Sequence, residues 1–365
     1  MFCTIITTVW LAMTLSTSSD KPVGVIGAGN FGTVMANMLA EQKQVLLYTR
    51  NHEKAKQIRE TRKSRGIELH PSIDVVTNLE LLANSCDVIF PIVPSAVFRA
   101  MMRDLAPFLK PYHLLIHGTK GLDLKLPHGE TIETMKFLDR TMVKTMSEVI
   151  REESVVARVG CLAGPNLSRE LAERQPGATV IASPFQEVIQ TGKKLLRSDR
   201  FQVYENNDLI GVELAGVLKN IIAIAAGALS GLGYGENARG LLISRGAVEM
   251  VYMGRAMGGN TKAFLGVAGI GDLVATCNSP SSRNFTVGYR LAKGEKLPEI
   301  LADMDEVAEG VNTVKIIKKC ADFYKVRAMI TESLYRVLFE NMTVQDALSQ
   351  LMRFQFTLDI DFIKD

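Results

Sequence analysis

The chain has 365 residues, of which 47% are hydrophobic and 22% charged, with a net charge of +3 at pH 7. This length suggests two domains with sizeable cores, and so small and evenly spread a charge argues against a nucleic-acid partner. Five scattered cysteines without a CxxC pair indicate reduced thiols and a cytoplasmic protein. No metal site is expected, because His113 and His117 flank a strand-like HLLIH, in which that separation is roughly 13 Å.

The first fifteen residues, MFCTIITTVWLAMTL, form a short apolar stretch before the polar STSSDK. The stretch lacks a basic n-region and a clear cleavage site, and it is short and threonine-rich for a membrane span. We interpret residues 1–20 as an extension before the fold, with Met13 as an alternative start, and expect no stable membrane insertion. A secretory signal or a membrane anchor is the other interpretation.

The segment KPVGVIGAGNFG joins an apolar strand at 23–26 to a glycine-rich turn, and a helix is expected to follow at 33–41. In this setting G-x-G-x-x-G predicts a dinucleotide site. The first glycine permits the tight turn, the second lets the backbone approach a pyrophosphate, and the third lets helix pack on strand. The three glycines are Gly27, Gly29 and Gly32. A turn without a ligand is the simpler alternative.

The second expected strand, at 45–48, is followed by Thr49, Arg50 and Asn51. NAD-specific sites usually carry an acidic residue here, whereas a basic residue can receive the 2′-phosphate of NADP. Arg50 therefore indicates that NADPH is preferred, or tolerated beside NADH, unless it is only a solvated residue at a strand end. The charged HEKAKQIRETRKSRG that follows is interpreted as a solvated surface helix and loop.

Short Val/Ile/Leu-rich runs then alternate with helical or loop segments: DVVTN, CDVIFPIV, HLLIHGT, VVARVGCLAG, ATVIA and FQVY. This alternation predicts an α/β fold with a Rossmann-like, mostly parallel sheet. Ligands bind outside the carboxyl ends of such strands. The chain carries candidate ligands there at Pro94-Ser95, Thr119-Lys120 and Gly164-Pro165-Asn166. Residues 122–153 are expected to be helical with a loop at 127–129, and no chemistry is assigned to them.

The strand pattern stops near residue 207, which predicts a dinucleotide-binding domain over 21–207 and an all-helical substrate and catalytic domain over 208–365. Residues 211–231 are almost wholly apolar around Lys219. Because a central lysine is costly in lipid, a helix buried in protein explains this run better than a membrane span. Poor hydration favours the neutral amine, so the pKa of Lys219 should fall toward working pH. Alternatively, the amine reaches solvent or pairs with a carboxylate such as Glu213.

The segment FLGVAGIGDLVATCNSPSSRN, at 264–284, is interpreted as a loop with turns at its glycines. Asp272 follows these glycines. An arginine beside hydroxyl and amide donors makes a phosphate clamp, which we expect from Ser282, Arg283 and Asn284. A plain surface turn is the alternative.

These motifs, in this order, resemble the bacterial-type NAD(P)-dependent glycerol-3-phosphate dehydrogenases. The resemblance rests on GAGNFGT at 27–33, KGL at 120–122, AGPN at 163–166, GVELAGVLKNIIAIAAG at 211–227, GIGDLVATC at 269–277, SRN at 282–284 and AEG at 308–310. It implies reversible reduction of dihydroxyacetone phosphate to sn-glycerol 3-phosphate, the backbone of glycerophospholipids. Asn166 stands where many members have threonine, and the N-terminal extension and the long 122–153 region are also unusual for the family.

By position, the resemblance implies Lys219 as the general acid and base. It implies substrate contacts at Lys120, Gly164, Asn166, Lys219, Asp272, Ser282, Arg283 and Asn284. It implies contacts with NADPH or NADH at Gly27, Gly29, Asn30, Phe31, Gly32, Arg50, Lys120, Ser168, Arg283, Val307 and Glu309. Two other functions remain open, a β-hydroxyacid dehydrogenase acting on a carboxylate substrate and a non-catalytic NAD(P)-sensing protein. A homodimer is compatible with the apolar helical half.

Overall fold

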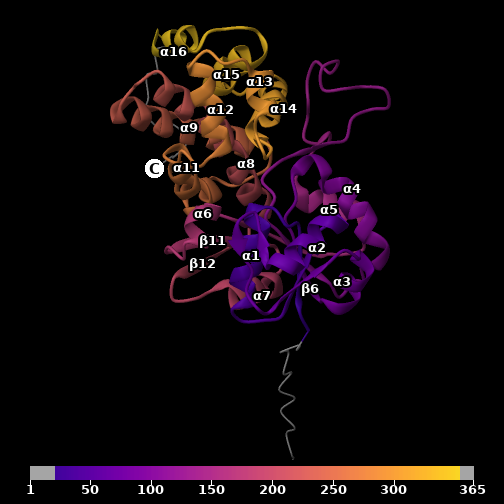
Figure 1. Cartoon of the computed structure of the whole chain (residues 1–365). Helices are drawn as coiled ribbons and strands as arrows, with labels where there is room; N and C mark the ends of the chain where they lie inside the picture. The colour runs from indigo at the N-terminus through magenta and orange to yellow at the C-terminus, as the bar shows by residue number, and fades with distance from the viewer. Residues whose placement is uncertain (1–20, 354–365) are drawn as a thin grey trace, which may run out of the picture.

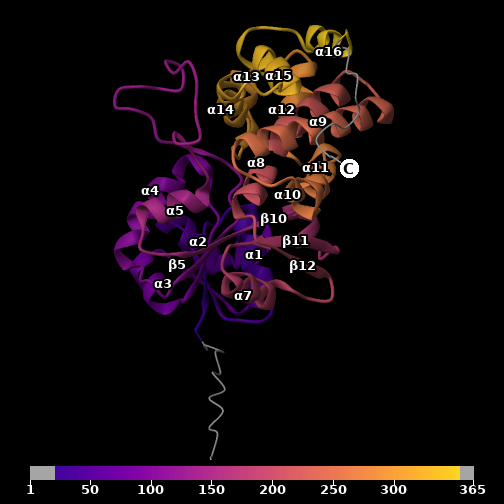
Figure 2. The ribbon, with the colours of Figure 1, turned by 180° about the vertical axis from the view of Figure 1, so that it is seen from behind.

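The computed structural model describes residues 21–353. The extension expected at 1–20, with Met13, and the end of the expected helical domain at 354–365 lie outside the described residues. Figures 1 and 2 show two lobes, one that contains the sheet, coloured indigo to magenta, and one of helices, coloured orange to yellow.

An eight-stranded sheet forms the centre of the first lobe, in the order β12-β11-β10-β7-β6-β1-β2-β5. Neighbouring strands run parallel except β10 and β11, which are antiparallel. This confirms the expected Rossmann-like, mostly parallel sheet. Its strands are β1 (Val23–Ile26), β2 (Val45–Tyr48), β5 (Ile73–Val76), β6 (Val88–Pro91), β7 (Leu114–His117), β10 (Arg158–Ala163), β11 (Gly177–Ala182) and β12 (Phe201–Asn206).

Helices cover both faces of the sheet, so its inner strands are apolar on both sides. β1 and β7 are buried along their whole length. One face packs against α1 (Asn30–Ala40), α2 (His52–Thr61) and α7 (Gln186–Leu196). The other face packs against α3 (Leu79–Ser85), α4 (Ser95–Leu105) and α5 (Met146–Glu153). Two short hairpins, β3 (Lys63–Ser64) with β4 (Ile67–Glu68) and β8 (Asp123–Leu124) with β9 (Val143–Lys144), lie outside the sheet.

The second lobe is helical, as expected. Its helices are α8 (Leu209–Gly231), α9 (Glu236–Ala256), α10 (Thr261–Leu265), α11 (Asp272–Cys277), α12 (Arg283–Ala292), α13 (Leu297–Ala302), α14 (Glu309–Tyr324), α15 (Met329–Phe339) and α16 (Val344–Arg353). A single turn of π-helix, η2 (Val267–Gly271), precedes α11, and a short α6 (Ser168–Ala172) and the 3₁₀ turn η1 (Ala106–Phe108) belong to the sheet lobe.

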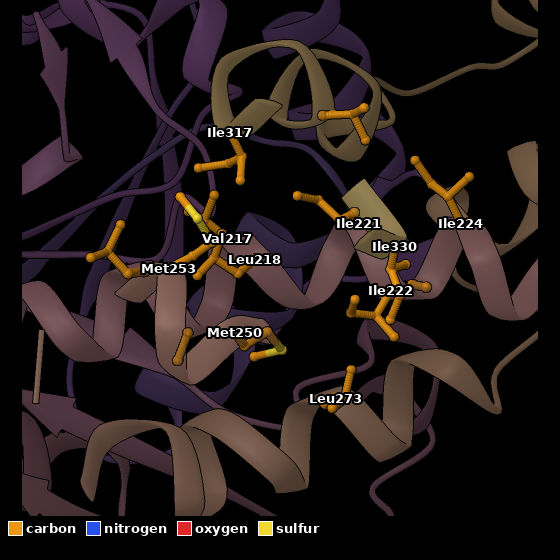
Figure 3. Packing of buried hydrophobic residues seen from close by; sticks show 14 of the residues in the cluster. Val217, Leu218, Ile221, Ile222, Ile224, Met250, Met253, Leu273, Ile317 and Ile330 are labelled. Atoms are coloured by element: carbon orange, nitrogen blue, oxygen red, sulfur yellow. The ribbon is translucent and has the colours of Figure 1, made fainter. Parts of the chain in front are cut away.

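Helix α8 is the centre of the second lobe. Figure 3 shows its side chains, among them Val217 and Ile221, meeting Met250 of α9, Leu273 of α11 and Ile317 of α14. Among the described residues α8 is the helix long and apolar enough to cross a membrane, but 89% of its most apolar window is buried in the protein. It therefore packs as a core helix.

Helices α8 and α12 touch backbone to backbone. A Cβ added to Gly227 of α8 would lie 1.9 Å from the carbonyl oxygen of Phe285, and one added to Gly288 of α12 would lie 1.8 Å from that of Ile224. Neither position has room for a side chain. The spacing of the two helices is therefore set by main-chain atoms, which move less than side chains do.

Two expectations for local structure were wrong. Residues 125–142 are not helical, because their few apolar residues dock on the second lobe instead of forming one helical face. Leu138 is fully buried there, and the backbone N–H of Arg140 donates to the hydroxyl of Tyr324 on α14 at 2.9 Å. The region 264–284, expected as a loop, is largely helical, because Gly266 to Gly271 join α10 to α11 through the π-helical turn.

Candidate active site

The glycine turn between β1 and α1 has space only for glycine at its first and third positions. Gly27 has φ of +119°, and an added Cβ would lie 2.1 Å from the carbonyl oxygen of Ile92. A Cβ on Gly32 would lie 1.8 Å from the carbonyl oxygen of Gly27. Helix α1 begins at Asn30, three residues before the expected start, so its free N–H groups lie inside the turn. This arrangement suits a pyrophosphate.

The residue expected to contact the 2′-phosphate of NADP lies at the end of β2. Arg50 is exposed at this strand end. Lys54, which the sequence interpretation left on a solvated face, donates from Nζ to the carbonyl oxygen of Ala28 in the glycine turn at 2.7 Å. Burial lowers the pKa of Lys54, and the neighbouring Arg65 lowers it further. Lys54 could be recognised in the sequence only by its place in the first turn of α2, where Asn51 caps the helix.

Lys219 is buried and held by two groups of α11. Its Nζ lies 2.9 Å from Oδ1 of Asp272 and 2.5 Å from Oγ1 of Thr276, and the residue is 5% exposed. Burial lowers the pKa of Lys219 to about 8, and the charge of Lys120 acts in the same direction while Asp272 opposes it. The expected dry amine with a lowered pKa is therefore present.

Asp272 connects Lys219 to the sheet lobe. Its Oδ2 lies 2.6 Å from Nζ of Lys120, which follows β7 and also donates to the carbonyl oxygen of Gly164 after β10, at 3.1 Å. Burial alone would raise the pKa of Asp272, but the ammonium groups of Lys120 and Lys219 hold it below its usual value. The structure thus brings four of the expected substrate residues together.

Thr276 is the residue of this group that sequence reasoning missed. Its hydroxyl donates to the carbonyl oxygen of Asp272 one helical turn earlier, at 2.7 Å, and is also the group nearest the amine of Lys219. The i, i+4 spacing of Asp272 and Thr276 would have placed both on one helix face. That signal was hidden because the segment was interpreted as a loop.

The carbonyl group of the Asn166 side chain has no hydrogen-bond partner within residues 21–353. Its Nδ2 donates to Oγ1 of Thr179 at 3.0 Å, while its buried Oδ1 accepts no hydrogen bond from the described residues. Gly164 just before it has φ of +152° and lies against the backbone of Thr179. Since buried acceptors are normally satisfied, Oδ1 is available to a ligand.

The three residues expected to form a phosphate clamp already make contacts within the protein. Ser282 caps α12 through its side chain, and Oδ1 of the buried Asn284 accepts from the backbone N–H of Gly310 at 2.9 Å. Arg283, whose side chain is 47% exposed, reaches Oε2 of Glu306 at 3.2 Å. Of the three residues, Arg283 is therefore the one with an exposed side chain.

The other expected cofactor positions lie at or just before the starts of α1, α6 and α14. Glu309 begins α14, and its carboxylate accepts from the backbone N–H of Ser95 at 2.8 Å and from the Ser95 hydroxyl at 2.5 Å. Phe31 lies in the first turn of α1 beside Gly118. Ser168 begins α6, and Val307 is exposed in the connection before α14.

Lys219 pairs with a carboxylate, as the alternative considered from the sequence allowed, but the partner is Asp272 and not Glu213. Oε1 of Glu213 lies 2.9 Å from Nε2 of His117 and accepts from the backbone N–H of Ser147 at 2.9 Å. Burial opposes ionisation, but His117 and Ser147 together hold the pKa of Glu213 below its usual value. This buried group joins α8 to β7 and α5 beneath the site.

Comparison with known proteins gives two family matches. Residues 22–189 match the family described as NAD-dependent glycerol-3-phosphate dehydrogenase N-terminus, and residues 208–349 match the corresponding C-terminus. Together they cover most of the chain.

Relatives and a solved structure agree with these matches. A glycerol-3-phosphate dehydrogenase (NAD(P)+) of Pseudomonas aeruginosa is 39% identical over 351 residues, covering 95% of this chain and 98% of the relative. That of Azotobacter vinelandii is 39% identical over 348 residues, covering 94% and 97%. The crystal structure of glycerol-3-phosphate dehydrogenase from Coxiella burnetii is 29% identical, covers 92% of this chain and 99% of that one, and superposes with a TM-score of 0.81.

Proposed function

Because this chain belongs to the NAD-dependent glycerol-3-phosphate dehydrogenase family, we propose how its residues divide the work of that reaction. The enzyme is an oxidoreductase that uses NADH or NADPH to reduce dihydroxyacetone phosphate reversibly to sn-glycerol 3-phosphate. Family membership favours this activity over a β-hydroxyacid dehydrogenase and over a non-catalytic sensor. The buried amine of Lys219 is the observation that carries the mechanism.

Lys219 moves the proton of the reacting hydroxyl. In the oxidative direction the neutral amine takes the proton from the C2 hydroxyl, and in the reductive direction the ammonium returns it to the developing alkoxide. A pKa of about 8 makes both forms available near neutral pH. Asp272 and Thr276 hold the amine in place from one face of α11, so that its remaining hydrogen-bonding direction is left for substrate.

The substrate's polar groups are bound from the sheet side. Lys120 presents its ammonium beside Asp272, and the carbonyl oxygen of Gly164 fixes its direction. The unpartnered Oδ1 of Asn166 accepts a hydrogen bond from a substrate hydroxyl. This assignment explains how asparagine can replace threonine at the position, since both supply an oxygen acceptor.

The substrate's phosphate lies at the start of α12. Arg283 provides a charged, planar donor, and the first N–H groups of the ten-residue helix point the same way. Ser282 and Asn284 support this end of the helix through the cap and through Gly310. Binding energy at the phosphate then positions C2 against Lys219.

The glycine turn fits a nicotinamide dinucleotide, because Gly27 and Gly32 have no room for a side chain and keep the turn tight, while a Cβ on Gly29 would have one neighbour within 4 Å. When bound, the cofactor supplies or accepts the hydride at C2. We assign its binding to the turn at Gly27, Gly29 and Gly32, to Asn30, Phe31, Lys120, Ser168, Arg283, Val307 and Glu309, and to Arg50 for a 2′-phosphate. Exposed Arg50 supports use of NADPH.

The domain limits that we propose, 21–207 and 208–365, meet between β12 and α8. The free and buried thiols of Cys86, Cys161, Cys277 and Cys320 support a cytoplasmic location. A homodimer, formed through the helical domain, also stays a prediction. It is supported by exposed apolar side chains at Leu265, Ile270 and Val274.

The activity is tested by following nicotinamide absorbance with purified enzyme, dihydroxyacetone phosphate and each cofactor in turn. We expect oxidation of NADPH or NADH that depends on dihydroxyacetone phosphate. Oxidation that instead requires a β-keto acid would support the β-hydroxyacid dehydrogenase, and cofactor binding without turnover on either substrate would support the sensor.

A further inference from the structure

Residues 303–308 form a connection from α13 to α14 that reaches back to the sheet lobe. Glu306, near its end, places Oε1 3.5 Å from the backbone nitrogen of Asn30. Glu309, at the start of α14, accepts from the backbone nitrogen of Ser95 at 2.8 Å. One segment of the helical lobe therefore places two carboxylates against backbone nitrogens of the sheet lobe.

The two nitrogens are the first of α1 and of α4. These helices follow β1 and β6, which are neighbours in the sheet, while β2 lies on the other side of β1. The order of the strands thus reverses between β1 and β6, and an α/β sheet binds its ligand in the crevice at such a point. Both carboxylates occupy the positive helix ends that frame this crevice.

Glu306 lies where the glycine turn is open. A Cβ added to Gly29 would lie 3.9 Å from Oε1 of Glu306 and would have no other neighbour within 4 Å. The opposite oxygen, Oε2, lies 3.2 Å from Nη1 of Arg283. The carboxylate of Glu306 therefore neutralises the start of α1 and Arg283 together, the two features to which we assign phosphate groups.

We propose that Glu306 is an internal anion that competes with the cofactor's pyrophosphate at α1 and so sets the affinity of the enzyme for NADPH and NADH. This inference rests on the proposed function, because it takes the glycine turn as the cofactor site. When the dinucleotide binds, the Glu306 carboxylate leaves the start of α1, and its hold on Arg283 is released. The Glu306 side chain moves while the backbone of the segment stays in place, so that Val307 and Glu309 keep the cofactor contacts that we assign to them.

The test measures cofactor binding without turnover. NADPH is titrated into the purified full-length enzyme, and its fluorescence gives Kd for the wild type, for Glu306→Gln and for Glu306→Ala. Asp305→Asn is the matched control, since it removes a carboxylate from the adjacent, exposed position. ADP-ribose, which carries the pyrophosphate without nicotinamide, is titrated by calorimetry.

We expect both Glu306 variants to lower Kd for NADPH and for ADP-ribose by about two- to ten-fold, because removing a carboxylate frees a helix end and an arginine. The gain should shrink at high salt, where exposed charges are screened. Asp305→Asn should match the wild type.

An unchanged or raised Kd in both Glu306 variants would overturn the inference, because Glu306 would then be neutral toward the cofactor or bind it directly. An equal gain in Asp305→Asn would also overturn it, because the effect would then be one of overall charge. If the wild type binds neither NADPH nor ADP-ribose, the proposed function fails instead, and the two failures are thus told apart.

Discussion

Asp272 holds the amine of Lys219 at 2.9 Å, and both groups are buried in the protein. The same carboxylate also binds Lys120 at 2.6 Å. Two ammonium groups thus share one buried counter-charge, which favours the loss of one proton. Lys219 is the more deeply buried of the two lysines, which supports our proposal that it acts as the base.

The two directions of the reaction should have opposite pH dependences. Neutral Lys219 is needed to oxidise glycerol 3-phosphate, so kcat/KM should rise with pH and level off above about 8. The ammonium is needed to reduce dihydroxyacetone phosphate, so that rate should fall above about 8. Initial rates from pH 6 to 10 test this. Profiles that rise or fall together would contradict the assignment of Lys219.

Lys219→Ala should remove turnover while leaving cofactor binding unchanged. We expect kcat to fall by about 10²- to 10⁴-fold, the usual contribution of a general acid or base. Asp272 keeps Lys120 as its partner in this variant, so NADPH fluorescence titration should give the wild-type Kd. The exposed Lys125→Ala serves as the control. Substantial turnover by Lys219→Ala would remove the lysine from its role.

Arg283→Ala should act through the substrate's phosphate. The loss of a charge-assisted hydrogen bond, about 1.5–3 kcal/mol, corresponds to a rise in KM for dihydroxyacetone phosphate of about 10- to 100-fold. At saturating NADPH, which offsets the loss of Arg283 from the cofactor site, dihydroxyacetone, which lacks the phosphate, should react as slowly with the variant as with the wild type. Lys293→Ala, at the other end of α12, is the control. Equal losses on both substrates would contradict the assignment.

Arg50→Asp should change the choice of cofactor. A carboxylate at the end of β2 repels a 2′-phosphate and accepts from a free 2′-hydroxyl, so the ratio of kcat/KM for NADPH to that for NADH should fall on the order of ten-fold or more. The same charge change at exposed Lys194 on α7 controls for overall charge. An unchanged ratio would show that Arg50 does not contact the 2′-phosphate.

Glu213→Ala should lower stability. The change removes the carboxylate beside His117 and leaves the Ser147 hydroxyl and backbone N–H buried without their acceptor, which costs about 1–3 kcal/mol for each unsatisfied donor. Urea unfolding followed by circular dichroism measures the loss. Glu187→Ala, which breaks the more exposed pair with Arg158, should cost less than about 1 kcal/mol. Similar losses in both variants would contradict this account of Glu213.

Local patterns were enough to predict the sheet and α8. Most strands are short apolar runs, and α8 is a long apolar run broken by Lys219, so each is visible within a few neighbouring residues. Residues 125–142 were wrongly expected to be helical because their apolar residues pack on α14, a partner about 180 residues away in sequence, as Arg140 and Tyr324 show. Nothing in the local pattern reveals such a partner.

Residues of the candidate site could be named from the sequence, but their arrangement in space could not. Lys120 and Asp272 are separated by 152 positions, and only the fold shows that they touch. Thr276 was missed because its helix was interpreted as a loop. Glu306 was missed because a carboxylate in a short acidic connection looks like any solvated residue, and its place at α1 depends on how the two lobes meet.

The close approach of α8 and α12 at Gly227 and Phe285 has a consequence for selectivity. Lys219 belongs to α8 and Arg283 to α12. The distance between the proposed proton acceptor and the proposed phosphate-binding residue is therefore fixed by the main chain. A substrate whose hydroxyl is one carbon farther from its phosphate could not contact Lys219 and Arg283 at the same time. The enzyme should therefore reject longer phosphorylated homologues by length.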